Sequence, residues 1–183
     1  MARKGDVIEN PISKERVVFH HTRESTNNEL LQMEAFHLAD GYNRVYHVHP
    51  TQVERHEVLE GKMGVNVDGR ELFLGPGESV VFEKGVPHKF WNADKSVVIH
   101  FVTEFRPAFD TEVFIETYIA LARAGKFRND GFPRRLQFFV MLHEHPIAGY
   151  IARVPIWIQK VVIAAGAFLG RIRGHVGTYA YRP

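Results

Sequence analysis

The first part of the chain alternates short apolar runs with turn residues. Between residues 15 and 106 the runs are rich in Val, Ile, Leu and Phe, and Gly, Pro and Asp separate them. Short runs of this composition are typical of β-strands, and many in regular succession favour a sandwich or barrel. The expected strands cover residues 17–19, 31–38, 44–49, 57–67, 70–74, 79–82, 88–91 and 96–105.

The turn residues between these runs support the strand pattern. Asp68-Gly69 lies between two apolar runs and predicts a two-residue hairpin, because a type I′ turn needs positive φ at both central residues. Asp40-Gly41 predicts a break after the second run. Gly75-Pro76-Gly77 and Gly85-Val86-Pro87 separate the later runs.

The pattern becomes helical after Arg106-Pro107. Residues 110–125 carry a wide apolar face, with Asp110 as the expected N-cap and Gly125 at the end. Further helices are expected over residues 134–143 and 156–169. We therefore divide the chain into a β-domain with an N-terminal arm, residues 1–108, and a helical extension, residues 109–183, packed on the β-domain or on a dimer partner.

The last of these helices is strongly apolar. Residues 156–169 are fewer than the ~20 that a spanning helix needs, and they include Gln159 and Lys160. We therefore expect no transmembrane span, but an amphipathic or buried helix that packs on the barrel or across a dimer. Peripheral membrane contact through residues 154–173, helped by the basic residues nearby, is the alternative.

Composition excludes several classes of protein. The 183 residues are 45% hydrophobic and include no Cys, which rules out a disulfide scaffold, a thiolate metal site and a cysteine nucleophile. The first residues are charged and lack the apolar segment of a secretory signal peptide, so we expect a cytoplasmic protein.

Charge is distributed unequally along the chain. The net charge of +2 combines −4 over residues 1–110 with +6 over residues 111–183. The basic residues of the second part are scattered among apolar ones, so nucleic-acid binding is not expected. The sequence also contains no glycine-rich phosphate loop and no dinucleotide fingerprint.

Histidine is the residue type that points to chemistry. Eight of the 11 histidines lie in the first 110 residues, and histidine is the commonest side-chain metal ligand. His47 and His49 stand two apart on an expected strand, so both imidazoles point to one face. Glu54 follows after a short connection and is expected to return on the neighbouring strand, and His88 begins another strand. Three imidazoles and one carboxylate suit Fe(II), Mn(II), Ni(II), Cu(II) or Zn(II).

These residues carry a resemblance to a known family. The first signature of the cupin superfamily is similar to Gly41 to Gly61, where a Gly, His, His, Glu and Gly occur in the family's spacing. The second signature resembles Gly77 to Asn92, with Gly85 and His88 in place and Glu83 where Pro is usual. The departure falls on a turn and leaves all four ligand positions occupied.

The resemblance implies a fold and a site. It implies a mainly β fold, a cupin-type double-stranded β-helix or jelly-roll barrel, here followed by C-terminal α-helices. It further implies one divalent transition metal, held inside by three His and one Glu, a small-molecule substrate and a homodimer. The implied metal ligands are His47, His49, Glu54 and His88.

Strand alternation adds candidates for the pocket beside the metal. His56 shares a face with Glu54, and Phe90 shares one with His88, if the strands are regular. His100 lies on the last expected strand, where either its own face or that of its neighbours is turned inward. His143-Glu144-His145 repeats the spacing of the strand motif, but on a helix side chains two apart diverge, so a second metal site is not expected.

The choice of reaction stays open at this stage. The ligand set is similar to that of cupin dioxygenases, and also to that of metal-dependent cupin isomerases, decarboxylases and lyases. Aromatic residues near the motifs suit a small aromatic or apolar substrate, so oxygenation with Fe(II) is placed first: Tyr42, Tyr46, Phe82, Phe90, Trp91 and Phe101. A non-catalytic metal- or small-molecule-binding module is the alternative, because fold and ligand set do not fix a reaction.

Overall fold

The computed structural model describes residues 2–37, 45–94 and 96–181. The predicted break at Asp40-Gly41 lies outside the described residues, as do Leu38 and Arg44, which end or begin two of the expected strands.

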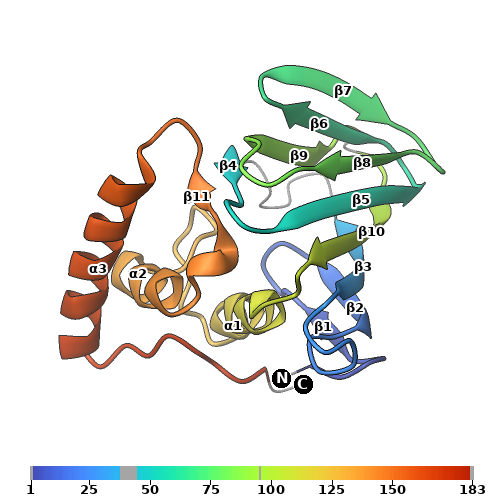
Figure 1. The fold of residues 1–183 in the computed structure, drawn as a ribbon. Coiled ribbons are helices and arrows are strands. Elements are labelled where there is room, and N and C mark those ends of the chain that lie inside the picture. Colours follow the sequence, from blue (N-terminus) through green and yellow to red (C-terminus); the bar gives the residue numbers. More distant parts are fainter. Residues whose placement is uncertain (1, 38–44, 95, 182–183) are drawn as a thin grey trace.

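Strands of the described residues form two antiparallel sheets that face each other as a jelly roll (Figure 1). One sheet has six strands in the order β1 (Val7–Glu9), β2 (Arg16–His21), β3 (Leu31–His37), β10 (Ile99–Arg106), β5 (Val53–Glu60) and β8 (Ser79–Phe82). The other has five in the order β11 (Tyr150–Ile151), β4 (His47–Val48), β9 (His88–Asn92), β6 (Met63–Val67) and β7 (Arg70–Leu74). The expected jelly-roll fold is therefore confirmed.

The core between the sheets follows from strand alternation. In β3 and β10 every second side chain is buried, as expected for strands with one face on a core. The six-stranded sheet contributes Val58 and Phe101 to one apolar cluster, and the five-stranded sheet contributes Met63 and Phe90. This shared cluster leaves little room at the closed end of the barrel, so the open end is where a ligand has space.

The predicted turns and strand ends mostly agree with the structure. β7 and β8 have the predicted bounds, and Asp68 (φ 48°) and Gly69 (φ 86°) form the hairpin between β6 and β7. The expected strand over residues 57–67 is wrong as one element: it is split into β5 and β6 at Gly61, whose φ is +85°. β1 and β11 were not predicted.

The helical part contains α1 (Thr111–Arg123), α2 (Arg135–Glu144), a short 3-10 turn η1 (Pro146–Ala148) and α3 (Ile156–Ile172). Asp110 stands at the expected N-cap position, but its side chain makes no capping hydrogen bond. It lies instead 2.6 Å from Nδ1 of the buried His145. Gly125, with φ +65°, follows the end of α1 as predicted.

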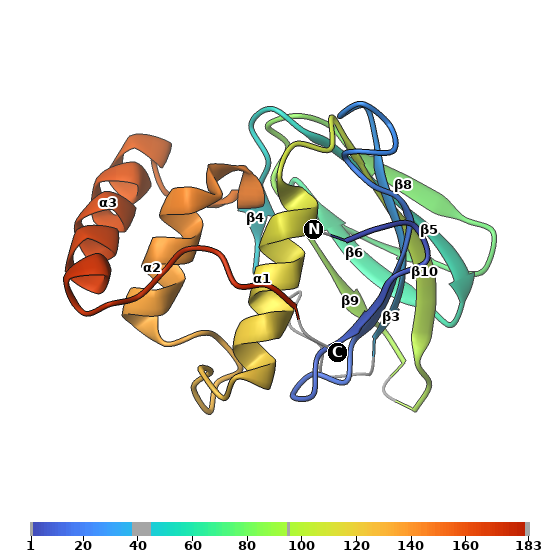
Figure 2. The same cartoon turned by 90° about the horizontal axis from the view of Figure 1, so that it is seen from below.

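The helices lie in succession beside the sheets, with α1 nearest the strands and α3 farthest away (Figure 2). α1 covers a second apolar cluster that contains Phe19, Leu31 and Ile119. α3 packs on α2 rather than on the barrel, because Gly166 lies against Phe139 and Gly170 against Val140 and Leu136. The division of the chain at residue 108 stays a prediction.

No helix in the described part of the chain is both long enough and apolar enough to cross a membrane. The expectation for α3 on this point is met by its length of 17 residues.

Candidate metal centre

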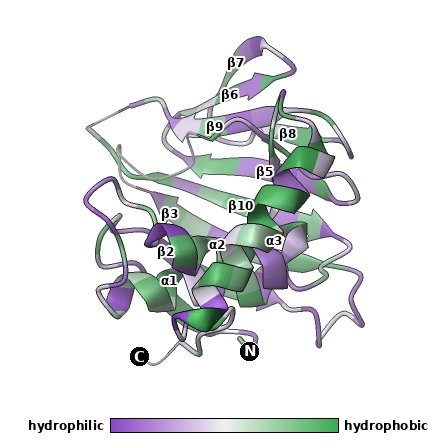
Figure 3. Cartoon of the chain, turned by 90° about the vertical axis from the view of Figure 1, so that its left-hand side faces the viewer, coloured by the Kyte–Doolittle hydropathy of each residue, from purple (hydrophilic) through white to green (hydrophobic). Residues whose placement is uncertain are grey.

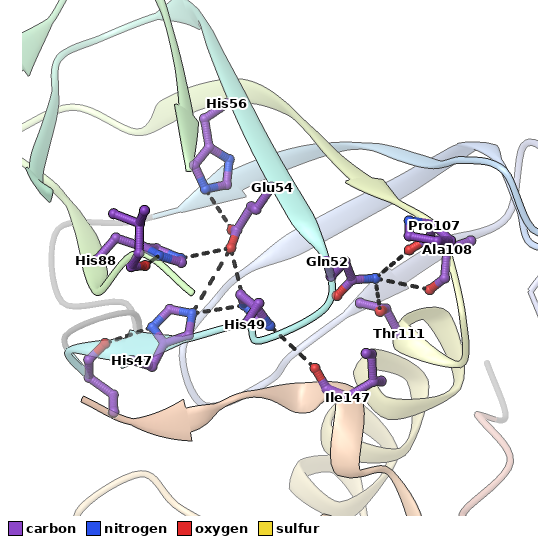
Figure 4. Close-up of polar contacts among 12 residues, drawn as sticks. His47, His49, Gln52, Glu54, His56, His88, Pro107, Ala108, Thr111 and Ile147 are labelled. Carbon is purple, nitrogen blue, oxygen red and sulfur yellow. Dashed lines mark hydrogen bonds and ion pairs between the residues drawn. The ribbon is translucent and has the colours of Figure 1, made fainter. Parts of the chain in front are cut away.

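The four predicted ligands lie together between the two sheets (Figure 4). His47 lies in β4, His49 directly follows β4, and His88 is the first residue of β9, so the five-stranded sheet carries all three histidines. Glu54 lies in β5 of the opposite sheet, and the expected return on a neighbouring strand is therefore wrong. The carboxylate faces the imidazoles across the interior of the barrel.

The donor atoms are at the separations that a shared metal ion requires. One ligand atom from each residue falls within 4.8 Å of the others. The Nε2 atoms of His47 and His49 are 3.1 Å apart, and Oε2 of Glu54 lies 3.2 Å from Nε2 of His49. The same oxygen lies 3.0 Å from Nε2 of His88. Metal–donor bonds of about 2.0–2.2 Å place neighbouring donors roughly 3.0–3.5 Å apart.

Backbone carbonyls fix the tautomer of each histidine. Nδ1 of His47 donates to Val45 O at 2.9 Å, and Nδ1 of His88 donates to Val86 O at 2.9 Å. Nδ1 of His49 donates to Ile147 O at 3.2 Å. Since a carbonyl can only accept, the proton of each neutral imidazole sits on Nδ1 and the Nε2 lone pair points to the centre. Three lone pairs and a carboxylate converging on one point form a donor set that fits a divalent cation.

Burial sets the charges of this cluster. Burial lowers the pKa of His47 to about 4, although the nearby Glu54 carboxylate opposes this shift. Burial by itself would raise the pKa of Glu54, but attraction by His56 and contacts from His49 and His88 outweigh it and hold that pKa well below its ordinary value. At neutral pH the site therefore presents neutral imidazole and ionised carboxylate, the forms that bind metal.

Two further residues hold Glu54 in place. Nε2 of His56 lies 2.8 Å from Oε1 of Glu54, the oxygen that is turned away from the histidine cluster. The His56 ring is fully buried and packs on Phe90, with 4.4 Å between ring centroids. Two residues before Glu54, Nε2 of the buried Gln52 lies 2.6 Å from Pro107 O and 2.9 Å from Thr111 Oγ1.

A cavity of about 660 Å³ opens beside the cluster. His47, His49 and Glu54 line it, as do the pocket candidates His56 and Phe90. His100 is not among the described residues that line the cavity. It stacks on Phe36 at 4.1 Å, with Nε2 3.3 Å from Glu34 Oε2, while its neighbours Ile99 and Phe101 are turned inward.

The aromatic residues near the motifs have different positions. Phe101 lines the cavity with Phe90, and Phe82 stacks on the His88 ring at 4.1 Å. Trp91 packs against Phe73, and Arg153 covers the ring of Tyr46. Tyr42 lies outside the described residues.

The described residues of the His143-Glu144-His145 segment do not form a shared site. Nδ1 of His143 lies 3.4 Å from Arg171, whereas Nε2 of His145 lies 3.1 Å from Thr178 Oγ1. The two imidazoles diverge at the end of α2, as the helical spacing predicted.

Sequence reasoning missed the contribution of the helical extension and one buried ion pair. Besides the Ile147 carbonyl, Gly149 packs so closely on the cluster that a Cβ there would lie 3.2 Å from the His49 ring and 3.3 Å from the His47 ring. Glu15 and His37 form a 2.8 Å contact in the wall of the cavity. Pro146 and Gly149 were interpreted only as breaks after a helix, and nothing in the spacing of Glu15 marks it.

Comparison with known proteins agrees with this geometry. Residues 36–103 match the family described as Cupin domain. The chain contains a cupin domain. The matched segment runs from β3 into β10 and includes every residue of the cluster.

Solved structures with similar folds are also cupins by their descriptions or are proteins of related names. The cupin resembles KdgF from a Halomonas species at 16% identity and a TM-score of 0.48, covering 58% of this chain and 90% of that one. It resembles an RmlC-like cupin from Shewanella frigidimarina at 22% identity and a TM-score of 0.49, covering 62% and 93%. A predicted oxalate decarboxylase from Thermotoga maritima shows 16% identity, a TM-score of 0.49, and coverage of 58% and 98%. No curated protein matches the sequence.

Proposed function

We propose that this cupin is a mononuclear divalent-metal protein that acts on a small organic molecule inside the barrel, as a dioxygenase-like oxidoreductase. The observation that carries the proposal is the convergence of three Nε2 lone pairs and the Glu54 carboxylate on one point beside a cavity. Fe(II) is the favoured ion, and Mn, Ni, Cu or Zn would fit the same donors.

The metal would be held by His47, His49, Glu54 and His88. When bound, such an ion supplies a Lewis acid and, in the case of iron, a redox centre. The chain's own residues orient and shield the site. His56 holds the rear oxygen of Glu54, and the rings of Phe90 and Phe101 keep water from the inner wall of the cavity. A dry wall of this kind strengthens electrostatic interactions between the site and a bound molecule.

Oxygen consumption tests the proposed reaction. Iron-loaded protein is mixed with a set of enolic and phenolic compounds, and dissolved oxygen is followed with an electrode. We expect substrate-dependent consumption that is lost in His49→Ala and retained in His100→Ala, whose side chain lies outside the cavity. Tight binding of the same compounds without consumption of oxygen would contradict oxygenation and favour a non-catalytic binding module. Conversion of a compound without oxygen uptake would favour an isomerase or lyase.

The exposed side of α3 supports a proposal about partners. Trp157 is 69% exposed, Phe168 66% and Ile172 68%, on the side of the helix away from α2 (Figure 3). Lys160 and Arg171 flank these side chains, and residues 154–173 contain no Asp or Glu. We propose peripheral contact of this face with a negatively charged lipid surface, because a second copy would bring the two sets of cations together.

Vesicle sedimentation separates these partners. Binding should require phosphatidylserine in phosphatidylcholine vesicles, weaken as salt rises and be lost in Trp157→Ser. Absence of binding, together with a dimer by light scattering that the same substitution dissociates, would overturn the proposal. A homodimer through the barrel edges, as the cupin resemblance implies, is a separate proposal that light scattering of Trp157→Ser also tests.

A further inference from the structure

The walls of the cavity differ sharply in polarity. Every carboxylate and imidazole that lines it comes from the first part of the chain, among the described residues: Glu15, His37, His47, His49, Glu54 and His56. These groups gather where the two sheets approach each other. One pole of the cavity is therefore suited to a polar or charged group of a ligand.

The opposite wall is built by the helices and is apolar. It extends from α1 through α2 to α3 and contains, among others, Phe114, Ile119, Phe138, Leu142, Ile158 and Val162. No charged side chain of the described residues after 108 lines the cavity. Val162 lines the cavity and is 50% exposed, so the cavity reaches the surface at α3.

The polar side chains of the helical wall are already engaged or neutral. Thr111 Oγ1 is 2.9 Å from Gln52 Nε2, and the Tyr118 hydroxyl donates to Gly131 O at 3.2 Å. The Gln159 amide bonds to both the N–H and the C=O of Ile151. Burial raises the pKa of Tyr150, which keeps its hydroxyl uncharged. This wall therefore offers a ligand contact area rather than hydrogen bonds.

A small hydrophilic substrate would fill the polar pole and leave the apolar wall in contact with water. A ligand that covers that wall gains free energy in proportion to the apolar area it removes from water. We propose that the cavity binds an amphiphile, a carboxylate whose hydrocarbon chain runs from the metal cluster along the helices to α3. The inference rests on the proposed function, because it assigns the substrate class of the same site.

A chain-length series tests the hydrocarbon part of the ligand. Straight-chain carboxylates from acetate to hexadecanoate are titrated into metal-loaded protein by calorimetry, below their micelle concentrations. Full burial of a methylene strengthens binding by about fourfold, so we expect a gain of roughly two- to fourfold for each added methylene until the cavity is full. Affinity that does not depend on chain length would overturn the inference.

Two neighbouring valines provide a matched pair of variants. Val162 lines the cavity, whereas Val161 is 63% exposed on the same helix and is not among the lining residues. Val162→Glu should weaken dodecanoate binding at least tenfold, and Val161→Glu should leave it within about twofold, because only the first places a carboxylate beside the chain. An equal response of both variants would contradict the placement of the hydrocarbon chain.

The same samples distinguish failure of the inference from failure of the proposed function. Elemental analysis reports whether wild type, Val161→Glu and Val162→Glu hold the metal. Protein that holds the metal but shows no chain-length dependence overturns the amphiphile and leaves the metal site standing. Protein that holds no metal overturns the proposed function, and the chain-length series on that protein still tests whether the helical wall binds hydrocarbon.

Discussion

The two walls of the cavity differ in how they arise from the sequence. The sheet wall carries its chemistry in two short segments, where His47 and His49 are two residues apart and Glu54 follows closely. The helical wall has no motif, and its function depends on packing between α1, α2 and α3. The comparison teaches that reactive groups can be recognised from spacing, whereas the shape that selects a ligand is visible only once the chain is folded.

The largest expected effect is on the sheet wall. Glu54→Ala removes the only carboxylate of the cluster and leaves three buried neutral imidazoles. We expect the metal content to fall from about one ion per chain to a small fraction, since the anionic ligand that balances the cation is lost. Elemental analysis after gel filtration measures it. His100→Ala is the control, and equal metal content in both variants would remove Glu54 from the site.

An intermediate effect is expected where the two regions meet. Gly149 has φ +100°, and an added Cβ would lie 3.1 Å from Val48 O and 3.2 Å from the His49 ring. Gly149→Ala should displace β11 and the ligand histidines and weaken metal affinity by about tenfold, as substitutions behind metal ligands do.

Gly174→Ala is the matched control for this variant. Gly174 also has a positive φ, of +79°, but nothing lies within 4 Å of an added Cβ. Competition with a chelator measures both affinities. If the two variants lose metal equally, the effect belongs to backbone strain alone, and the helical extension does not support the site.

The smallest effect on the metal is expected in the helical wall. Phe139 packs on Gly166 of α3 and is half-buried, so Phe139→Ala should cost roughly half of the ~3–5 kcal/mol of a fully buried Phe. The Tm should fall by about 4–8 °C, measured by calorimetry, with metal affinity unchanged. Val161→Ala, at an exposed position of the same helix pair, should leave both unchanged. A loss of metal in Phe139→Ala would show that the two walls are not separable.

How far the sequence predicts this molecule follows the range of the contacts involved. The Asp68-Gly69 hairpin and strands β7 and β8 depend on neighbours in the chain, and their bounds were predicted. The four clustered residues were named from spacing, because strand alternation places His47 and His49 on one face. Glu54 was assigned to the wrong sheet, since the order of strands is set by pairings between distant segments.

Contacts across long stretches of sequence could not be predicted. The Ile147 carbonyl reaches His49 over 98 residues, and β11 pairs with β4 although its two residues carry no strand pattern of their own. Asp110 satisfies the local rule for an N-cap, but its side chain turns to His145, a partner 35 residues away that local propensity does not reveal. Tertiary partners of this kind override local preferences.

The central claim is that one metal ion is bound by both sheets of the barrel. Crystals of the iron-loaded protein, measured on either side of the iron absorption edge, test it most directly. The account predicts one anomalous peak, about 2.0–2.2 Å from the Nε2 atoms of His47, His49 and His88 and from Oε2 of Glu54. A protein that takes up iron but shows its peak away from these four residues, or none at all, would contradict the account.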